Sequence, residues 1–140
     1  MACHDQERYD EAVEAYREAL RRQPDFPIAL SNLGNTLKRQ GKLAEAEEHY
    51  RETLRLKPDY AIAYNNLGTT LDAQGRLGEA EAGFRRALEL RPEYAEAHCN
   101  LGIVLEQQDR AAEAEASHRR ALRLKPDPAE AHGSLGNALL

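Results

Sequence analysis

Apolar residues recur along the chain at the spacing of amphipathic helices. One stripe stands at Leu30, Leu33 and Leu37, the positions i, i+3 and i+7 that share one face of an α-helix. A second stripe follows it at Leu43, Ala46, Tyr50 and Leu54. Both stripes return 34 residues later. The pattern predicts two helices in every stretch of that length.

Glycine and proline mark the ends of these predicted helices. Gly41 and Gly75 stand between the first and second stripe, where a left-handed helix C-cap is expected. A proline follows each second stripe and cannot continue a helix. The prolines that share this spacing are Pro24, Pro58, Pro92 and Pro126. Each unit is therefore expected to run helix, tight turn, helix, tight turn.

The order of residues within a unit resembles the tetratricopeptide repeat family. The middle unit carries the residues of that motif, which are Tyr64, Leu67, Gly68, Leu71, Ala80, Phe84, Ala87 and Pro92. The resemblance implies an all-α fold, a right-handed α-solenoid of antiparallel helix pairs. It gives full repeats at 27–60, 61–94 and 95–128, with a half repeat at each end, a second helix in 1–26 and a first helix in 129–140.

The third full unit departs furthest from the motif. Asp109 replaces the turn glycine, His98 takes the bulky position and His118 takes the aromatic one. The glycine of the motif is explained by packing alone. Gly68 is expected to let the first helix approach the second where it faces Ala80, and the neighbouring units repeat this pair.

Composition and net charge argue against some classes of binding partner, nucleic acid and anionic membranes among them. A chain of 140 residues fits one domain. The net charge is −5, and no basic block interleaved with aromatic residues occurs, so neither nucleic acid nor an anionic membrane is an expected partner. The longest uncharged runs have 12 residues, too few to span a bilayer. The two cysteines make no disulfide framework, so a soluble protein of the reducing cytoplasm is expected.

The sequence offers no convincing catalytic or metal site. His98 and His132 occupy the same position in successive units, so their backbones should lie about 10 Å apart, too far for one zinc ion. Ser117 and His118 are adjacent on a helix and diverge, which excludes a nucleophile–base pair. We expect no enzyme, no metal and no cofactor.

The asparagine of the recurring Asn-Leu-Gly is the main candidate for binding. The resemblance implies that first helices line a concave groove, and Asn32, Asn66 and Asn100 recur there. An amide side chain both donates and accepts, so it can bond a peptide backbone. Units spaced by about 10 Å would meet roughly every third residue of an extended chain. Similar asparagine ladders line the repeats of O-linked N-acetylglucosamine transferases, whose catalytic region has no counterpart here. The alternative is that these amides bond within the array or face water.

Further polar residues are expected beside this ladder. Asn35, Asn65 and Thr69 would flank it. Lys38 and Arg39 would orient an acidic end of the ligand, and a basic end would meet Asp72, Glu96 and Glu106. The carboxylate clamp of chaperone-binding relatives is not matched, because Ser31, Glu96 and Asn100 stand where that clamp needs basic residues.

Self-assembly is the second functional hypothesis. A first helix in 129–140 of one chain could dock on the second helix at 8–22 of the next and complete a unit. Such head-to-tail contacts are heterologous and give open filaments. The residues expected at the joint are Leu135 and Leu139 at one end, and Val13, Tyr16 and Leu20 at the other.

Overall fold

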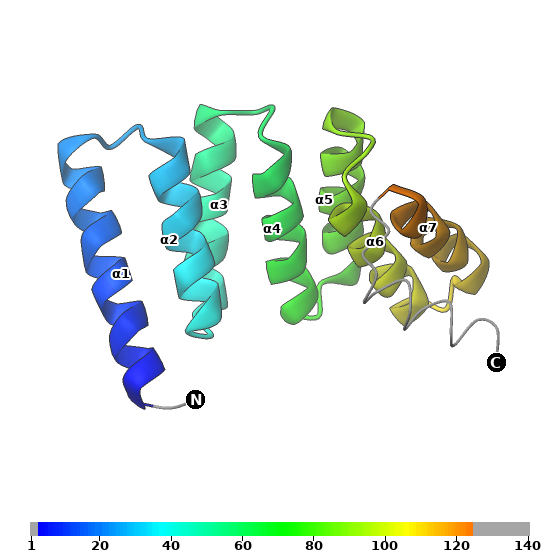
Figure 1. Cartoon of the computed structure of the whole chain (residues 1–140), viewed down its shortest axis with the longest axis horizontal. Helices are drawn as coiled ribbons and strands as arrows, with labels where there is room; N and C mark the ends of the chain where they lie inside the picture. Colours follow the sequence, from blue (N-terminus) through cyan, green and yellow to red (C-terminus); the bar gives the residue numbers. More distant parts are fainter. Residues whose placement is uncertain (1–2, 125–140) are drawn as a thin grey trace.

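Helices follow one another in chain order as a curved row in the computed structural model (Figure 1), which describes residues 3–124. The helices are α1 (Cys3–Arg22), α2 (Pro27–Arg39), α3 (Leu43–Leu56), α4 (Ala61–Ala73), α5 (Leu77–Leu90), α6 (Ala95–Gln107) and α7 (Ala111–Leu124). The described residues contain no strand. The expectation of an all-α solenoid is confirmed.

The tight turns inside each unit have the backbone that the glycines predict. Gly41 has φ 82° and Gly75 has φ 78°, the left-handed conformation that a residue without Cβ adopts at little cost. Asp109, which takes the same place in the third unit, also has φ 60°. Aspartate tolerates this region better than most residues do, so the turn keeps its shape without glycine.

The two apolar stripes of each unit meet in one continuous core. Leu33, Leu37 and Tyr50 are at most 1% exposed, and Leu71 and Phe84 repeat this arrangement in the next unit. Val104, Leu105 and Ala114 extend the core into α6 and α7. The core therefore runs the length of the array between the helices of each pair.

The motif glycines lie against aromatic rings, which differs from the expected contact with alanine. A Cβ placed on Gly68 would lie 2.5 Å from Cε1 of Phe84, and one on Gly34 would lie 2.9 Å from Cε1 of Tyr50. In the third unit the ring above Gly102 is that of His118. The ring of the second helix fills the space that the glycine leaves open, so it sets the distance between the two helices.

A repeated cluster of polar side chains joins neighbouring units. The carboxylate of Glu47 on α3 accepts hydrogen bonds from Arg76 Nη1 at 2.7 Å and Gln74 Nε2 at 3.2 Å, both from the following unit. Glu81 accepts from Arg110 at 2.7 Å and Gln108 at 3.0 Å in the same way. These two junction clamps were not foreseen from the sequence, although Gln-X-Arg recurs 34 residues apart.

The junction between α1 and the first full unit is built differently. Val13 stands where a clamp glutamate would be, and Lys42 takes the place of the arginine. Gln40 Nε2 instead donates to Asp10 Oδ1 at 2.7 Å. Among the described residues, ion pairs between neighbouring units therefore occur only at the two later junctions, those of Glu47 and Glu81.

Candidate functional site

One surface of the array is formed by the first helices of the units, α2, α4 and α6. α2 contacts α4, and α4 contacts α6, in addition to the contacts within each helix pair. Successive first helices therefore lie close together and make a continuous row. We call the exposed stripe along this row the inner face, and its residues are Ile28, Asn32, Asn35, Arg39, Ile62, Asn66, Thr69, Ala73, Glu96, Asn100, Ile103 and Gln107.

Asn32 and Asn66, the first two asparagines of the predicted ladder, have side-chain amides that form no hydrogen bond among the described residues. Asn32 and Asn66 are half-buried on the inner face. Their backbone carbonyls accept from the hydroxyls of Thr36 and Thr70, at 3.1 and 2.9 Å. Within residues 3–124, no hydrogen bond involves the side-chain amide of either asparagine. Both amides keep a donor and an acceptor for a ligand.

Asn100, the third asparagine of the ladder, is bonded to Asn65, the residue that precedes the second ladder asparagine, Asn66. Asn100 Nδ2 on α6 donates to Asn65 Oδ1 on α4 at 3.0 Å. Asn65 is 0% exposed, which corrects the expectation that it faces the groove. The neighbouring helix covers Asn65, so this residue positions Asn100 and cannot itself touch a ligand on the surface. Asn100 retains its Oδ1 acceptor.

Three more predicted ligand contacts, Asn35, Lys38 and Thr69, already form hydrogen bonds within the array. The hydroxyl of Tyr50 donates to Asn35 Oδ1. Lys38 on α2 donates to Thr69 Oγ1 on α4, and Thr69 Oγ1 in turn donates to the Asn66 carbonyl at 2.8 Å. The bond between Lys38 and Thr69 links two neighbouring units, and any ligand must add to these bonds or replace them.

Positive and negative side chains lie at different places along the row of first helices. Burial lowers the pKa of the Lys38 ammonium, and the opposing effects of Glu96 and Asp72 do not offset it. Arg39, Glu96 and Glu106 are exposed, whereas Asp72 is half-buried. The basic side chains sit at the end of α2, while α4 and α6 carry only acidic ones.

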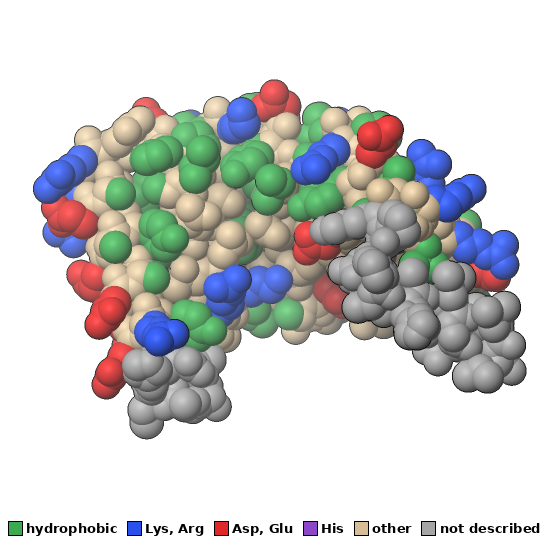
Figure 2. All heavy atoms as spheres, in the orientation of Figure 1, with side chains coloured by type: hydrophobic (Ala, Val, Ile, Leu, Met, Phe, Trp, Pro, Cys, Tyr) green, Lys and Arg blue, Asp and Glu red, His purple; other side chains and the backbone are tan. Residues whose placement is uncertain are grey.

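Large apolar side chains are also exposed on this surface. Ile28 is 54% exposed, and Ile62 and Ile103 are each 39% exposed. Figure 2 shows apolar side chains over α2 and α4 on the face turned to the viewer in Figure 1, with Lys and Arg side chains gathered lower on the same face. An exposed apolar cluster rimmed by polar groups is typical of an interaction surface.

The histidines examined for metal binding have other contacts. His98 Nε2 donates to the carbonyl of Pro92 at 2.9 Å. The ring of His118 lies 3.1 Å from the carboxylate of Glu106, and His132 lies outside the described residues. In the part of the chain that the structure describes, no group of three potential ligands is arranged to hold a metal ion, and no helix is long and apolar enough to cross a membrane.

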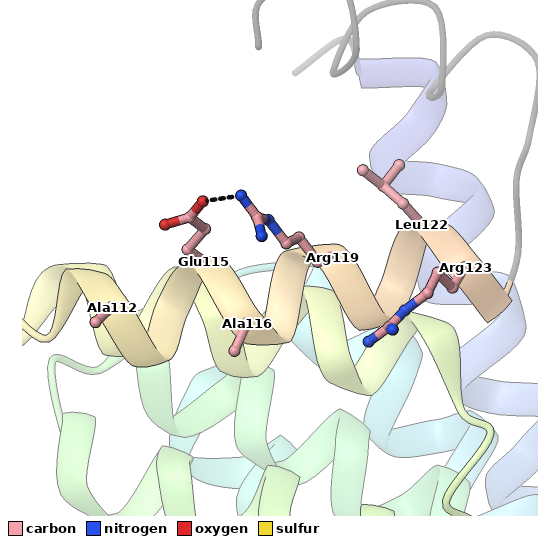
Figure 3. Close-up of a pocket in the computed structure, with 6 residues that line it drawn as sticks. All are labelled: Ala112, Glu115, Ala116, Arg119, Leu122 and Arg123. Atoms are coloured by element: carbon pink, nitrogen blue, oxygen red, sulfur yellow. Dashed lines mark hydrogen bonds and ion pairs between the residues drawn. The ribbon is translucent and has the colours of Figure 1, made fainter.

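A hollow of about 540 Å³ lies along the face of α7 that carries Glu115 and Arg119 (Figure 3). Its described lining residues are Ala112, Glu115, Ala116, Arg119, Leu122 and Arg123. Glu115 follows Glu47 and Glu81 at the same spacing and is bonded to Arg119, as Glu47 is bonded to Arg51. The side chain of Glu115 is 62% exposed, against 15% for the two clamp glutamates, because no following unit covers it among the described residues.

The residues expected at the self-association joint are largely covered by their own chain. Val13 is 8% exposed and belongs to the core, and Tyr16 and Leu20 pack against it. Leu135 and Leu139 lie outside the described residues. Of the residues expected at the joint, the structure therefore describes only Val13, Tyr16 and Leu20.

Comparisons with known proteins agree with this architecture. Family profiles described as "Tetratricopeptide repeat" match residues 25–93 and residues 65–127 and 99–140, and one described as "TPR repeat" matches 2–41. No match was found among curated proteins.

Solved structures of MamA are similar in fold. One MamA crystal structure has a TM-score of 0.79 at 27% identity, over 90% of this chain and 76% of that one. A structure of MamA residues 41 to the end from Desulfovibrio magneticus RS-1 has a TM-score of 0.77 at 22% identity, over 86% of this chain and 68% of that one.

Proposed function

Because the chain belongs to the tetratricopeptide repeat family, a family of protein-interaction modules, we propose that its inner face binds an extended segment of a partner protein. Asn32, Asn66 and Asn100 contact the backbone of that segment. The chain acts as a scaffold and catalyses no reaction.

The observation that carries this proposal is the pair of unused amides on Asn32 and Asn66. A polar group that solvent can reach bonds to water until a ligand offers it a partner. These two amides occupy the same position on neighbouring first helices and bond to nothing else among the described residues. An extended peptide advances about 3.3 Å per residue, so a spacing of about 10 Å brings every third peptide group to a rung.

The charged residues of the first helices determine which end of the ligand is acidic and which is basic. Arg39 is the exposed cation at the α2 end, and Lys38 lies beside it with its ammonium on Thr69. An acidic part of the ligand belongs at this end. A basic part belongs near Asp72, Glu96 and Glu106.

Replacing all three ladder asparagines by alanine is expected to weaken binding strongly while leaving the fold intact. Each lost hydrogen bond costs about 1 kcal/mol, so the loss of three lowers the affinity by roughly a hundredfold. Ligands are first selected on the wild-type chain from a library of random peptides, and their Kd is measured by fluorescence anisotropy.

The control for this variant removes two exposed side chains far from the inner face, with Glu48→Ala on α3 and Arg120→Ala on α7. This control is expected to bind like the wild type. The proposal is wrong if the selected peptides bind the triple variant as tightly as the wild type, or if no peptide is selected.

Head-to-tail self-association is a second candidate, and the α7 hollow favours it. Glu115 presents the carboxylate that binds the next unit at each earlier clamp, and Ala112, Ala116 and Leu122 surround it with apolar surface. The occupant proposed for this surface is a second copy of the chain, whose helix would take the place of the first helix expected at 129–140 or stack beyond it.

Self-association predicts a mass that rises with concentration in light scattering coupled to size-exclusion chromatography. Ala116→Glu places a charge in the hollow and is expected to keep the chain at 15.7 kDa. Ala44→Glu on α3 is the matched control, since Ala44 is also an exposed alanine of a second helix. A wild-type mass of 15.7 kDa at every concentration contradicts this candidate.

A further inference from the structure

We propose that the inner face selects a segment of the pattern apolar–X–X–apolar–X–X–basic. The two apolar side chains contact Ile28 and Ile62, and the basic one contacts Glu96. This inference rests on the proposed function and adds the chemistry of the ligand's side chains.

Exposed isoleucines are confined to the inner face. Ile28, Ile62 and Ile103 are the large apolar residues exposed in the described part of the chain, and each lies on a first helix. The outer sides of the second helices instead carry Glu–Arg pairs such as Glu52 with Arg55 and Glu89 with Arg86. An apolar ligand side chain therefore finds its partner on the inner face.

Ile28, Ile62 and Glu96 form one row across the units. They are the second residues of α2, α4 and α6. The row therefore offers two apolar contacts and then one carboxylate. It runs beside the asparagine ladder, because Asn32, Asn66 and Asn100 each stand four residues later on the same helix face.

Glu96 is the carboxylate of this region that remains available to a ligand. It is exposed, and no ion pair to it occurs among the described residues. Glu106, the other exposed acid of α6, lies against His118. α4 and α6 contain no Lys or Arg, and the nearby Lys38 ammonium, whose pKa Glu96 acts to raise, is bonded to Thr69 on α4. Electrostatic complementarity selects a basic side chain at this point.

The spacing of the pattern follows from two lengths. Neighbouring first helices are about 10 Å apart, and an extended chain advances about 3.3 Å per residue. Three ligand residues therefore separate the contact at Ile28 from that at Ile62, and three more lead to Glu96. A backbone that follows the ladder can place its side chains on this row.

Three 13-residue probes with a fluorescein label test the pattern. Each has leucine at positions 4 and 7 and glycine or serine elsewhere, and position 10 is lysine, glutamate or leucine. Each probe is also made with the order of residues reversed, since either chain direction fits the row. In the favoured direction, the lysine probe is expected to bind the wild type roughly two to five times more tightly than the glutamate probe, as exposed ion pairs allow.

Glu96→Ile tests the assignment by changing the preference. This variant continues the isoleucine row, so the leucine probe is expected to bind better than the lysine probe. Glu48→Ile on the outer side of α3 is the matched control and is expected to leave the wild-type preference unchanged. Circular dichroism checks that both variants keep the helical content of the wild type.

Equal binding of the lysine and glutamate probes overturns this inference, and so does an unchanged preference in Glu96→Ile. Failure of all probes, while peptides selected from the random library still depend on the asparagines, also overturns the pattern but leaves the proposed function standing. If no peptide is selected from the random library, the proposed function itself is wrong.

Discussion

Gly68→Ala is expected to lower the free energy of unfolding by about 1–3 kcal/mol, the usual cost of overpacking a core. The added Cβ would lie 2.5 Å from Cε1 of Phe84. Phe84 is 1% exposed and cannot swing into solvent. Gly83 also brings α5 against α4, since a Cβ there would lie 3.3 Å from the Tyr64 carbonyl oxygen. The two helices must therefore separate to admit the methyl group.

Gly78→Ala is the matched control for this substitution. Gly78 lies in α5, and a Cβ placed on it would meet nothing within 4 Å. Alanine favours a helix over glycine by about 1 kcal/mol, so this variant is expected to be more stable than the wild type. Urea unfolding followed by circular dichroism measures both. Equal effects of the two substitutions would show that the contact with Phe84 does not set the helix spacing.

The junction clamps are expected to make the array sensitive to acid. Burial raises the pKa of Glu47, but hydrogen bonds from Arg51, Arg76 and Gln74 outweigh it and hold that pKa below its ordinary value of 4.5. The pKa of Glu81 is lowered by the same balance. A carboxyl whose pKa is lowered by folding stabilises the fold above the ordinary pKa, and this stability is lost as the pH falls through the folded-state value.

Glu47→Gln together with Glu81→Gln is expected to cost about 1 kcal/mol per junction at pH 7. The double variant should also lose less stability than the wild type when the pH is lowered from neutral to below 4.5, because it has no clamp carboxylates to protonate. Urea unfolding at several pH values measures both effects.

Glu115→Gln is the control for the clamps. Glu115 has the same position in its helix and the same pairing with an arginine four residues on, but no donor from another unit reaches it among the described residues. This variant is expected to change the free energy of unfolding by less than about 0.5 kcal/mol. A loss as large as that of a clamp variant would mean that the clamps do not join the units.

The helices and turns were predictable from the sequence because they depend on local chemistry. The spacing of apolar residues gave the helix faces, and the placement of Gly41 and Gly75 gave the left-handed turns. Asp109 has the same backbone conformation, which follows from its register in the repeat rather than from its residue type. These features need only the residues within one unit.

The relation between units could not be read from the sequence. Asn65 and Asn66 are adjacent and chemically identical, yet Asn65 is 0% exposed and bonds to Asn100 while Asn66 stays half-buried with its amide unused. Which of the two is covered depends on how the next helix pair is rotated, and the repeat length does not specify this rotation. The contact of Phe84 with Gly68 was missed for a related reason, because helix spacing alone does not show which way a ring turns.

The side-chain amide signals of the ladder asparagines test the central claim most directly. Their ¹H–¹⁵N resonances are followed by NMR while a peptide selected from the random library is added. We expect the signals of Asn32, Asn66 and Asn100 to shift with the same Kd as the peptide, and backbone signals of α3, α5 and α7 to stay in place. Shifts confined to those second helices, with unchanged ladder amides, would contradict binding at the inner face.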